Sequence, residues 1–209
     1  ALISCSTHVF ARPADWNPHI HQHGYWFVKE AQEYTPSTAL RTFLDHPDTP
    51  IYVGFGSMTG INPQPGLAEL VVAAVIKSGR RAVVSGLGHM PDLPDTIMSV
   101  DAVPHTWLFP RMAAVCHHGG AGTSAAGFAA GVPSMIVPFA NDQFAWGQRA
   151  YDLGVGTKPI ARRRLTVAAL SAAFVQAAQP ALRQAARTLA EQITTEQGAA
   201  QCAAVVAGI

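Results

Sequence analysis

Two adjacent histidines and three glycines stand together at residues 117–124, HHGGAGTS, directly after the apolar run AAVC. Glycines in a turn between a buried strand and a helix let backbone N–H groups approach a ligand closely, and the first turn of the helix adds free N–H groups and the positive end of its dipole. The imidazole of His118 and the hydroxyl of Thr123 are further hydrogen-bond donors. These residue types predict an anion site, and phosphate is the anion that suits it best.

A glycine-rich turn can also serve packing alone, so the turn by itself is a weak signal. The adjacent histidines favour a functional role. One of two neighbouring side chains on an extended segment points into the protein, which leaves a structural role open for His117.

The elements around this turn alternate between short apolar segments and helical patterns. We expect strands at 51–57, 81–87, 97–103, 113–119 and 134–139, and helices at 37–46, 64–79 and 123–131. The strands show little polar alternation, as expected when helices cover both faces of a parallel sheet. The sequence therefore predicts an α/β fold, a Rossmann-like doubly wound parallel sheet, with two or three packed C-terminal helices from Leu165 onward.

Residues 1–35 are rich in proline and histidine and show little helical period. We interpret them as a lead-in or interdomain linker segment that includes a short extended stretch, and residues 36–209 as the folded domain. In a sheet of this kind, ligands bind beyond the carboxyl ends of the strands. The turns 54–60, 103–107 and 117–124 are therefore expected to line one cleft.

Composition argues against several classes of protein. A net charge of +1, from 14 basic and 13 acidic residues, gives no electrostatic footprint for nucleic acid or an anionic membrane, and the arginines at 162–164 are expected to form a solvated turn. Three separated cysteines without a CxxC pair argue against a disulfide scaffold or zinc site and predict a cytoplasmic protein with reduced thiols. No apolar run reaches the length of a membrane span. The chain begins with alanine rather than methionine, which suggests a mature product or an excised piece.

The stretch 103–156, from VPHTWLFP to YDLGVG, resembles the donor-binding signature of UDP-sugar-dependent glycosyltransferases with two Rossmann-like domains. Within that superfamily it is most similar to the sterol 3-β-glucosyltransferases and, slightly less closely, to the glycosyltransferases that decorate glycopeptide antibiotics. The segments GYWF at 24–27 and IYVGFGSM at 51–58 also fit the C-terminal domain of the family in order and spacing. The resemblance covers nearly the whole chain, and it implies one half of a two-domain enzyme, in which residues 36–209 bind the nucleotide-sugar donor.

The resemblance also implies a set of contacts to the donor diphosphate. The residues that would make them are Gly56, Ser57, His118, Gly120, Gly122 and Thr123. Ser57 would reach the phosphates from the side opposite His118. Backbone amides and an imidazole suit this position, because they stabilise the charge that grows on a departing diphosphate.

Other residues would hold the base and the sugar of the donor. Val103 and His105 would lie along the nucleobase, with main-chain groups of Val103 reading its edge. Asp142 and Gln143 would hydrogen-bond the hydroxyls of the transferred sugar, since a carboxylate and an amide suit a polyhydroxyl ligand. Plant-type members carry a glutamate for the ribose hydroxyls where this chain has Ala126, and sterol-type members lack it too, so the nucleotide preference stays open.

The implied activity is inverting transfer of a hexose, with UDP-glucose as the default donor, to a hydroxyl of a sterol or of another lipophilic or natural-product acceptor. The family generally needs no metal ion and no further cofactor. Its catalytic base and most of its acceptor pocket lie in an N-terminal domain, so the resemblance assigns no catalytic residue here. Alone, this chain is expected to bind the nucleotide sugar weakly and to transfer nothing. A nucleotide-sugar-binding or assembly module without chemistry of its own is the alternative.

Three further interpretations are weaker. Ser124 in GTSAA is a near miss to a hydrolase nucleophile, but a catalytic histidine should follow it, and His118 is the last histidine of the chain. The glycines of 54–60 do not match a nicotinamide fingerprint, because the third is misplaced. The alternating histidines of HIHQH at 19–23 have no cysteine or acidic partner nearby, which favours solvated or packing histidines over a metal site.

Overall fold

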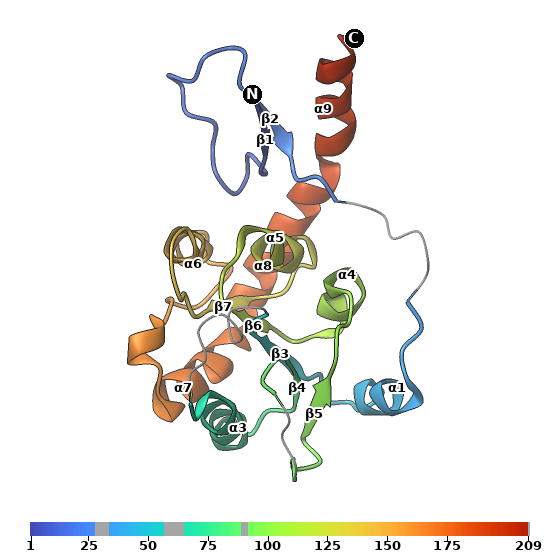
Figure 1. Ribbon diagram of the computed structural model, residues 1–209, viewed down its shortest axis with the longest axis vertical. Helices are drawn as coiled ribbons and strands as arrows, with labels where there is room; N and C mark the ends of the chain where they lie inside the picture. The colour runs from blue at the N-terminus through green and yellow to red at the C-terminus, as the bar shows by residue number, and fades with distance from the viewer. Residues whose placement is uncertain (28–33, 57–64, 89–91, 209) are drawn as a thin grey trace.

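The computed structural model describes residues 1–27, 34–56, 65–88 and 92–208, and Figure 1 shows their arrangement. A five-stranded parallel sheet lies at the centre, in the order β5-β4-β3-β6-β7. Its strands are β3 (Ile51–Gly54), β4 (Ala82–Ser85), β5 (Ile97–Val100), β6 (Val115–His117) and β7 (Ser134–Ile136). The chain runs outward from β3 to β5 and then returns to β6 and β7, so the strand order reverses between β3 and β6. A ligand site is expected at this switch point, outside the carboxyl ends of the strands.

The register of the sheet aligns the turns at this edge. His117 of β6 pairs with Gly54 of β3 on one side and with Ile136 of β7 on the other. The turns that follow these three strands therefore start side by side.

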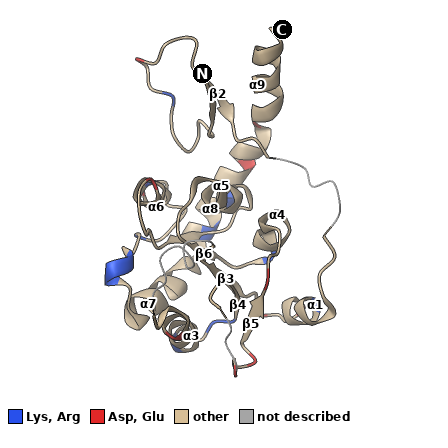
Figure 2. Ribbon diagram, in the orientation of Figure 1, with Lys and Arg blue, Asp and Glu red and all other residues tan. Residues whose placement is uncertain are grey.

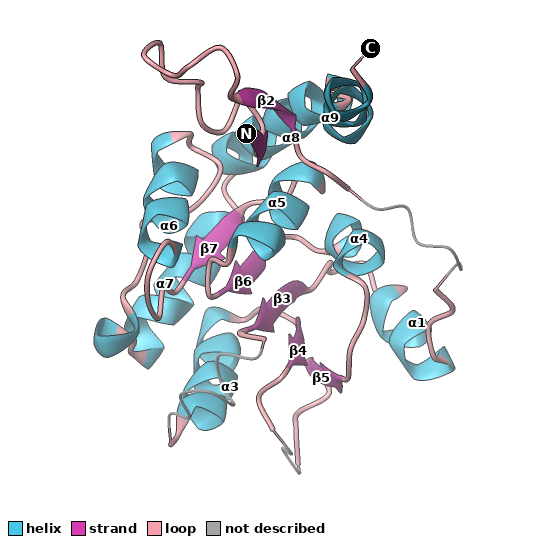
Figure 3. Cartoon of the chain, turned by 45° about the horizontal axis from the view of Figure 1, so that its top comes forward, coloured by secondary structure: helices cyan, strands magenta, loops and turns pink. Residues whose placement is uncertain are grey.

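Helices cover both faces of the sheet, as Figure 3 shows. The helices are α1 (Thr38–Leu44), α3 (Leu67–Ser78), α4 (His105–Leu108), α5 (Ala121–Ala129), α6 (Gln143–Asp152), α7 (Val167–Ala177), α8 (Pro180–Thr195) and α9 (Gly198–Ala207). Two short 3-10 turns are η1 (Phe109–Arg111), after α4, and η2 (Arg162–Arg164), between α6 and α7. The predicted α/β fold with a doubly wound parallel sheet is confirmed, and the tail from Leu165 onward forms three helices.

Each strand sends alternate side chains to opposite faces, which is why the strands read as continuous apolar runs. Val53 packs with Val71 of α3 and Phe174 of α7. Its neighbour Tyr52 packs instead with Leu40 of α1 and Leu108 of α4. Burial on both faces fixes the position of β3, and the turn that follows β3 is the first turn of the candidate site.

Two features differ from the expectation. All five strands end earlier than predicted, and after β3, β4 and β6 the reason is a glycine that turns the chain out of the extended region, as Gly56 does at φ +57° and Gly119 at φ +90°. Helix α6 was not expected, and Gly147 at its centre lowers its intrinsic helix propensity. Tertiary packing overrides that cost: a Cβ on Gly147 would lie 2.9 Å from Pro159 Cβ and 3.0 Å from Ile136 Cγ2, so only glycine lets the helix lie this close.

The N-terminal segment packs against the end of the chain. Strands β1 (Leu2–Ser4) and β2 (His21–Gly24) form a separate parallel pair beside α9, and both termini lie at the same end of the molecule (Figure 1). Glu196, just before α9, accepts hydrogen bonds at Oε1 from the Ser6 hydroxyl (3.1 Å) and the Thr7 N–H (3.1 Å). The boundary that we predict at residue 35 stays a prediction.

Within the described residues, no helix combines the length and the apolar character that a membrane crossing requires. No group of three or more His, Cys, Asp or Glu side chains in that part of the chain is placed to hold a metal ion. Of the alternating N-terminal histidines, His21 and His23 stack ring on ring, with centroids 5.9 Å apart.

Candidate functional site

The turn from β6 into α5 requires glycine for both conformation and space. Gly119 has φ +90°, a conformation that side chains with a Cβ rarely adopt. A Cβ at this position would lie 2.6 Å from Cγ2 of the buried Ile136 and 3.1 Å from the carbonyl oxygen of Gln143. The turn therefore lies directly against β7 and the start of α6.

Helix α5 opens toward the carboxyl edge of the sheet with no side-chain cap. Its N-cap is Gly120, whose carbonyl accepts from Ser124 N–H at 2.9 Å. The N–H groups of a first helical turn have no intrahelical acceptor, so those of Gly122 and Thr123 are available to an anion. Gly122 is exposed, and a Cβ there would meet nothing within 4 Å, so the approach to this turn is open.

His118 lies between the β3 and β6 turns, at the switch point. A Cβ on Gly56 would lie 3.7 Å from its Cε1, and a Cβ on Gly120 would lie 2.6 Å from its Nε2. The Nδ1 atom is buried and has no hydrogen-bond partner among the described residues. Burial lowers the pKa of His118, and the nearby Asp142 carboxylate raises it in part. The neutral imidazole of His118 therefore lies between two glycine turns, with Cε1 on the side of Gly56 and Nε2 on the side of Gly120.

His105 lies near this imidazole, at the first residue of α4. Its ring stacks on Phe109 at a centroid distance of 4.3 Å and meets the edge of Tyr52 at 5.7 Å. Burial lowers the pKa of His105, and proximity to His118 lowers it further. Val103, two residues earlier, is half-buried against the core beneath α4. The structure thus brings His105 close to His118, while the predicted contacts of Val103 and His105 with a nucleobase stay predictions.

Asp142 and Gln143 stand at the start of α6, on the other side of the Gly119 turn. Asp142 is exposed and accepts at Oδ2 from the Trp146 indole N–H at 3.0 Å. Gln143 is buried, and its Oε1 accepts from the backbone N–H groups of Phe139 (2.8 Å) and Ala140 (3.1 Å). Its side-chain carbonyl oxygen thus holds the loop after β7, and the predicted contacts of Asp142 and Gln143 with a sugar stay predictions.

Most of the predicted donor residues therefore gather along one edge of the sheet, around His118. Ser57 lies outside the described residues, so its predicted phosphate contact stays a prediction. Thr123 is half-exposed in the first turn of α5, and its predicted phosphate contact stays a prediction.

His117 supports the turn from below. It is fully buried, and its Nδ1 accepts from the Gly119 N–H at 3.1 Å. Burial lowers the pKa of His117 to about 3, and the neighbouring His118 adds to the shift. The imidazole is therefore neutral, and because Nδ1 accepts, its proton lies on Nε2. The sequence alone does not predict this partner of His117, because the HHGG pattern does not indicate that the first histidine accepts a hydrogen bond from the N–H of the residue two positions later.

The depressed pKa of His117 makes folding stability fall as the solution is acidified. The unfolded chain binds a proton near pH 6.5, whereas the folded chain resists it until about pH 3. Between these values the unfolded state holds more protons, so the free energy of unfolding should drop by about 1.4 kcal/mol per pH unit from this residue alone. Urea unfolding at pH 7, 6, 5 and 4 measures the slope.

The variant His117→Gln provides the control for this prediction, because it removes the titrating group. We expect a lower stability at pH 7 and a shallower dependence on pH. A slope that is unchanged in the variant would assign the acid sensitivity to other groups.

Comparison with known proteins places the chain in a family. Residues 69–207, more than half of the chain, match the family described as erythromycin biosynthesis protein CIII-like, C-terminal domain. The chain is 36% identical over 200 residues to sterol 3-beta-glucosyltransferase UGT80B1 of Arabidopsis thaliana, and this match covers 93% of the chain but 32% of the relative. The chain thus spans about a third of the length of that relative.

Solved structures share the fold at lower identity. The glycotransferase of kitacinnamycin superposes with a TM-score of 0.79 at 20% identity, covering 98% of this chain and 53% of the other. The spinosyn rhamnosyltransferase SpnG, in complex with thymidine diphosphate, gives a TM-score of 0.73 at 18% identity, covering 98% of this chain and 55% of the other. Together with the sequence match, these findings confirm the resemblance: the chain belongs to the erythromycin biosynthesis protein CIII-like C-terminal domain family and is similar in sequence to the C-terminal part of sterol 3-beta-glucosyltransferases.

Proposed function

We propose that this chain binds the diphosphate of a nucleotide sugar at the switch point between β3 and β6, as the donor half of an inverting glycosyltransferase. The observation that carries the proposal is the position of His118 between the glycine turns after β3 and β6, beside the uncapped start of α5. Backbone N–H groups, a helix dipole and an imidazole donor converge there on one small volume.

The proposed chemical role is to stabilise the leaving group. In a displacement at the anomeric carbon, negative charge grows on the diphosphate as its bond to the sugar breaks. The N–H groups of α5 and the His118 ring are already oriented, so they stabilise this charge without reorganisation at the moment of reaction. The same donor set can replace a metal ion at the diphosphate, and we therefore propose donor binding without a metal or other cofactor.

We propose UDP-glucose as the donor because the sterol relatives are named as glucosyltransferases. The pair Asp142 and Gln143 would hold the glucosyl hydroxyls, the first through its carboxylate and the second through its amide nitrogen. SpnG, which shares the fold, was solved with thymidine diphosphate, so the alternative nucleotide belongs in every binding experiment.

The acceptor in this proposal is the hydroxyl of a sterol or of another lipophilic compound, as the names of the relatives suggest. The general base and most of the acceptor pocket would belong to an N-terminal domain of the same enzyme. A non-catalytic nucleotide-sugar-binding module is the alternative. Fusing the chain to an N-terminal half from a sterol relative would separate the two, because restored transfer supports the enzyme and failure with several competent halves supports the module.

Calorimetric titration of the chain with UDP, UDP-glucose, dTDP and uridine tests the proposed donor site. We expect saturable binding of UDP and UDP-glucose, with uridine weaker by about 100-fold because it lacks the phosphates that α5 and His118 would contact. Uridine binding as tightly as UDP would overturn the phosphate assignment. Tighter binding of dTDP than of UDP would support the proposed diphosphate site and would identify dTDP as the preferred nucleotide.

A further inference from the structure

The carboxylate of Asp142 does not cap the helix that it starts. Asp142 is the N-cap residue of α6, and an aspartate at this position usually accepts from an N–H of the first helical turn. Here the side chain makes no such bond, and Oδ2 accepts instead from the indole N–H of Trp146, one turn later, at 3.0 Å. The backbone of Asp142 is already helical (φ −63°, ψ −16°), which directs the carboxylate along the helix surface and not onto the helix end.

The indole is the one hydrogen-bond donor to this carboxylate within the described part of the chain. No Lys or Arg of that part forms an ion pair with Asp142, and the continuous basic stretch in Figure 2 is η2, which follows α6 in the chain. The carboxylate is exposed, and it is near enough to His118 to raise the pKa of that imidazole in part. A carboxylate fixed through one oxygen therefore lies beside the proposed diphosphate site.

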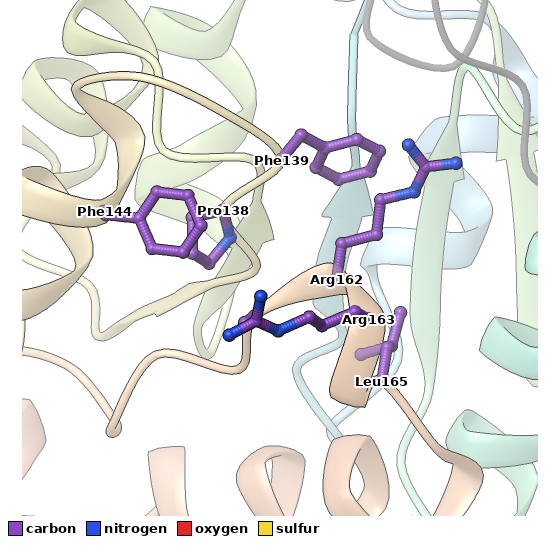
Figure 4. Close-up of a pocket in the computed structure, with 7 residues that line it drawn as sticks. Pro138, Phe139, Phe144, Arg162, Arg163 and Leu165 are labelled. Carbon is purple, nitrogen blue, oxygen red and sulfur yellow. The ribbon is translucent and has the colours of Figure 1, made fainter.

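Trp146 belongs to a stripe of α6 that faces the N-terminal segment. Asp142, Trp146 and Arg149 follow one another at spacings of four and three residues, which places them on the same face of the helix. Phe144 lies on another face, since it lines the pocket of Figure 4 with Pro138, and the described lining of that pocket includes neither Asp142 nor Trp146. The two faces of α6 thus have different neighbours.

Phe10 is the neighbour that holds the indole. The Phe10 and Trp146 rings meet edge to face, with centroids 5.2 Å apart and planes inclined at 79°. Arg149 fixes this contact from the helix side, because its guanidinium lies 5.6 Å from the centroid of the Phe10 ring and its Nε donates to the Val9 carbonyl. Val9 is fully buried, so the contact with α6 is part of a packed cluster.

The backbone of Phe10 is held on both sides as well. Its N–H donates to the Ser6 carbonyl at 3.0 Å, and its own carbonyl accepts from Nε2 of the buried Gln22 at 2.7 Å. The Ser6 hydroxyl in turn donates to Glu196 at 3.1 Å. Phe10 therefore stands on an anchored turn, and a rigid support of this kind leaves the indole little freedom to move.

We propose that Trp146 is a positioning residue for the sugar of the donor: its indole N–H holds Oδ2 of Asp142, so that the second carboxylate oxygen is left to accept from a sugar hydroxyl. Phe10 fixes the indole in place. The inference rests on the proposed donor site, and it makes the N-terminal segment, which the sequence places outside the donor-binding domain at 36–209, a part of sugar recognition.

Calorimetric titration of the full chain with UDP and UDP-glucose tests this role. Trp146→Phe keeps an aromatic ring and removes the N–H. We expect UDP affinity within about twofold of the wild type and UDP-glucose affinity weaker by about fivefold, the effect of leaving one side chain to be ordered on binding. Trp26→Phe is the matched control, because Trp26 lies on a different surface with Leu2 and Val206, and it should change neither affinity.

A double-mutant cycle gives a readout that a merely structural role would not produce. In the Asp142→Ala background, Trp146→Phe should cause no further loss of UDP-glucose affinity, because the group through which the indole acts is gone. Phe10→Ala should reproduce the selective loss of UDP-glucose affinity. Phe10→Tyr keeps the ring and should bind both ligands like the wild type.

Each other outcome counts against the proposal in a different way. An unchanged ratio of the two affinities in Trp146→Phe, an equal loss of both, or a full effect in the Asp142→Ala background would overturn the positioning role. If Asp142→Ala binds UDP-glucose like the wild type, the diphosphate site stands and the sugar contact is wrong. A wild-type chain that binds neither ligand would overturn the donor site, and this inference with it.

Discussion

Replacing His118 by alanine is expected to weaken UDP binding by about 10- to 100-fold, because a donor aimed at a charged phosphate contributes about 1.5–3 kcal/mol. The ring lies between the Gly56 and Gly120 turns, and its buried Nδ1 makes no hydrogen bond with the described residues. Removing it therefore breaks no described hydrogen bond of the fold, and the free energy of unfolding should change by no more than about 1 kcal/mol. Calorimetry with UDP and urea unfolding measure the two quantities.

Two companion variants sharpen the result. His118→Gln keeps an N–H donor and should recover part of the affinity, while His46→Ala removes an exposed histidine that pairs with Asp48 and should bind UDP like the wild type. If His118→Ala binds UDP as well as the wild type does, the phosphates lie elsewhere.

Proton uptake offers a readout that a merely structural role would not change. Burial lowers the pKa of His118 in the free chain, and a bound diphosphate would raise it again. Binding near pH 7 should then take up a fraction of a proton, which appears as a dependence of the calorimetric heat on buffer, and His118→Ala should abolish it. The variant should also raise the pKa of His105, since His118 contributes to its lowering, and NMR titration would detect that change.

The central sheet was predictable because four of its five strands, all except the edge strand β5, are buried on both faces. Residues such as Val53, Val84 and Val115 are fully buried, so a continuous apolar run and its flanking turns predict a strand without further knowledge. Strand ends were less predictable, because the exit from the sheet depends on the φ angle of a single glycine, as at Gly56 and Gly119.

Helix α6 shows where local pattern fails. Gly147 weakens the helical signal, and the compensation comes from Ile136 and Pro159, which contact the glycine from other segments. The pairing of β1 with β2 was unpredictable for a similar reason, since β2 packs against α9, which lies far along the chain.

The candidate site was likewise predictable in part. The residue types at 117–124 predicted a site for an anion, because glycines, a helix start and a histidine donor state their chemistry locally. The sequence did not show which of the neighbouring residues hold the loops in place and which are left to bind a ligand. Gln143, expected as a sugar contact, gives its carbonyl oxygen to the loop after β7, and His117 bonds the Gly119 N–H. These roles depend on which side of the chain each atom faces, which only the folded structure defines.

Gly119→Ala is expected to lower the free energy of unfolding by about 2–4 kcal/mol, the sum of forcing a side chain into a positive-φ conformation and of overlap with a packed core. The added methyl would lie 2.6 Å from Cγ2 of Ile136, a buried and β-branched residue that has no room to move, and 3.1 Å from the backbone oxygen of Gln143. Urea unfolding should show a lower midpoint with an unchanged m value. UDP binding should be lost as well, because the same strain displaces the start of α5.

Gly122→Ala is the matched control, since it adds the same methyl three residues away, where nothing lies within 4 Å and the backbone is helical. Alanine favours the helix over glycine, so stability should stay level or rise by up to about 1 kcal/mol. If a phosphate does approach the first turn of α5, this methyl nevertheless stands in its path, and UDP affinity should fall by about tenfold in a protein that folds at least as well as the wild type. Unchanged UDP affinity in Gly122→Ala would place the phosphates away from α5. Equal stability of the two variants would contradict the tight Gly119 turn. The pair thus separates what the glycines do for folding from what they do for the ligand.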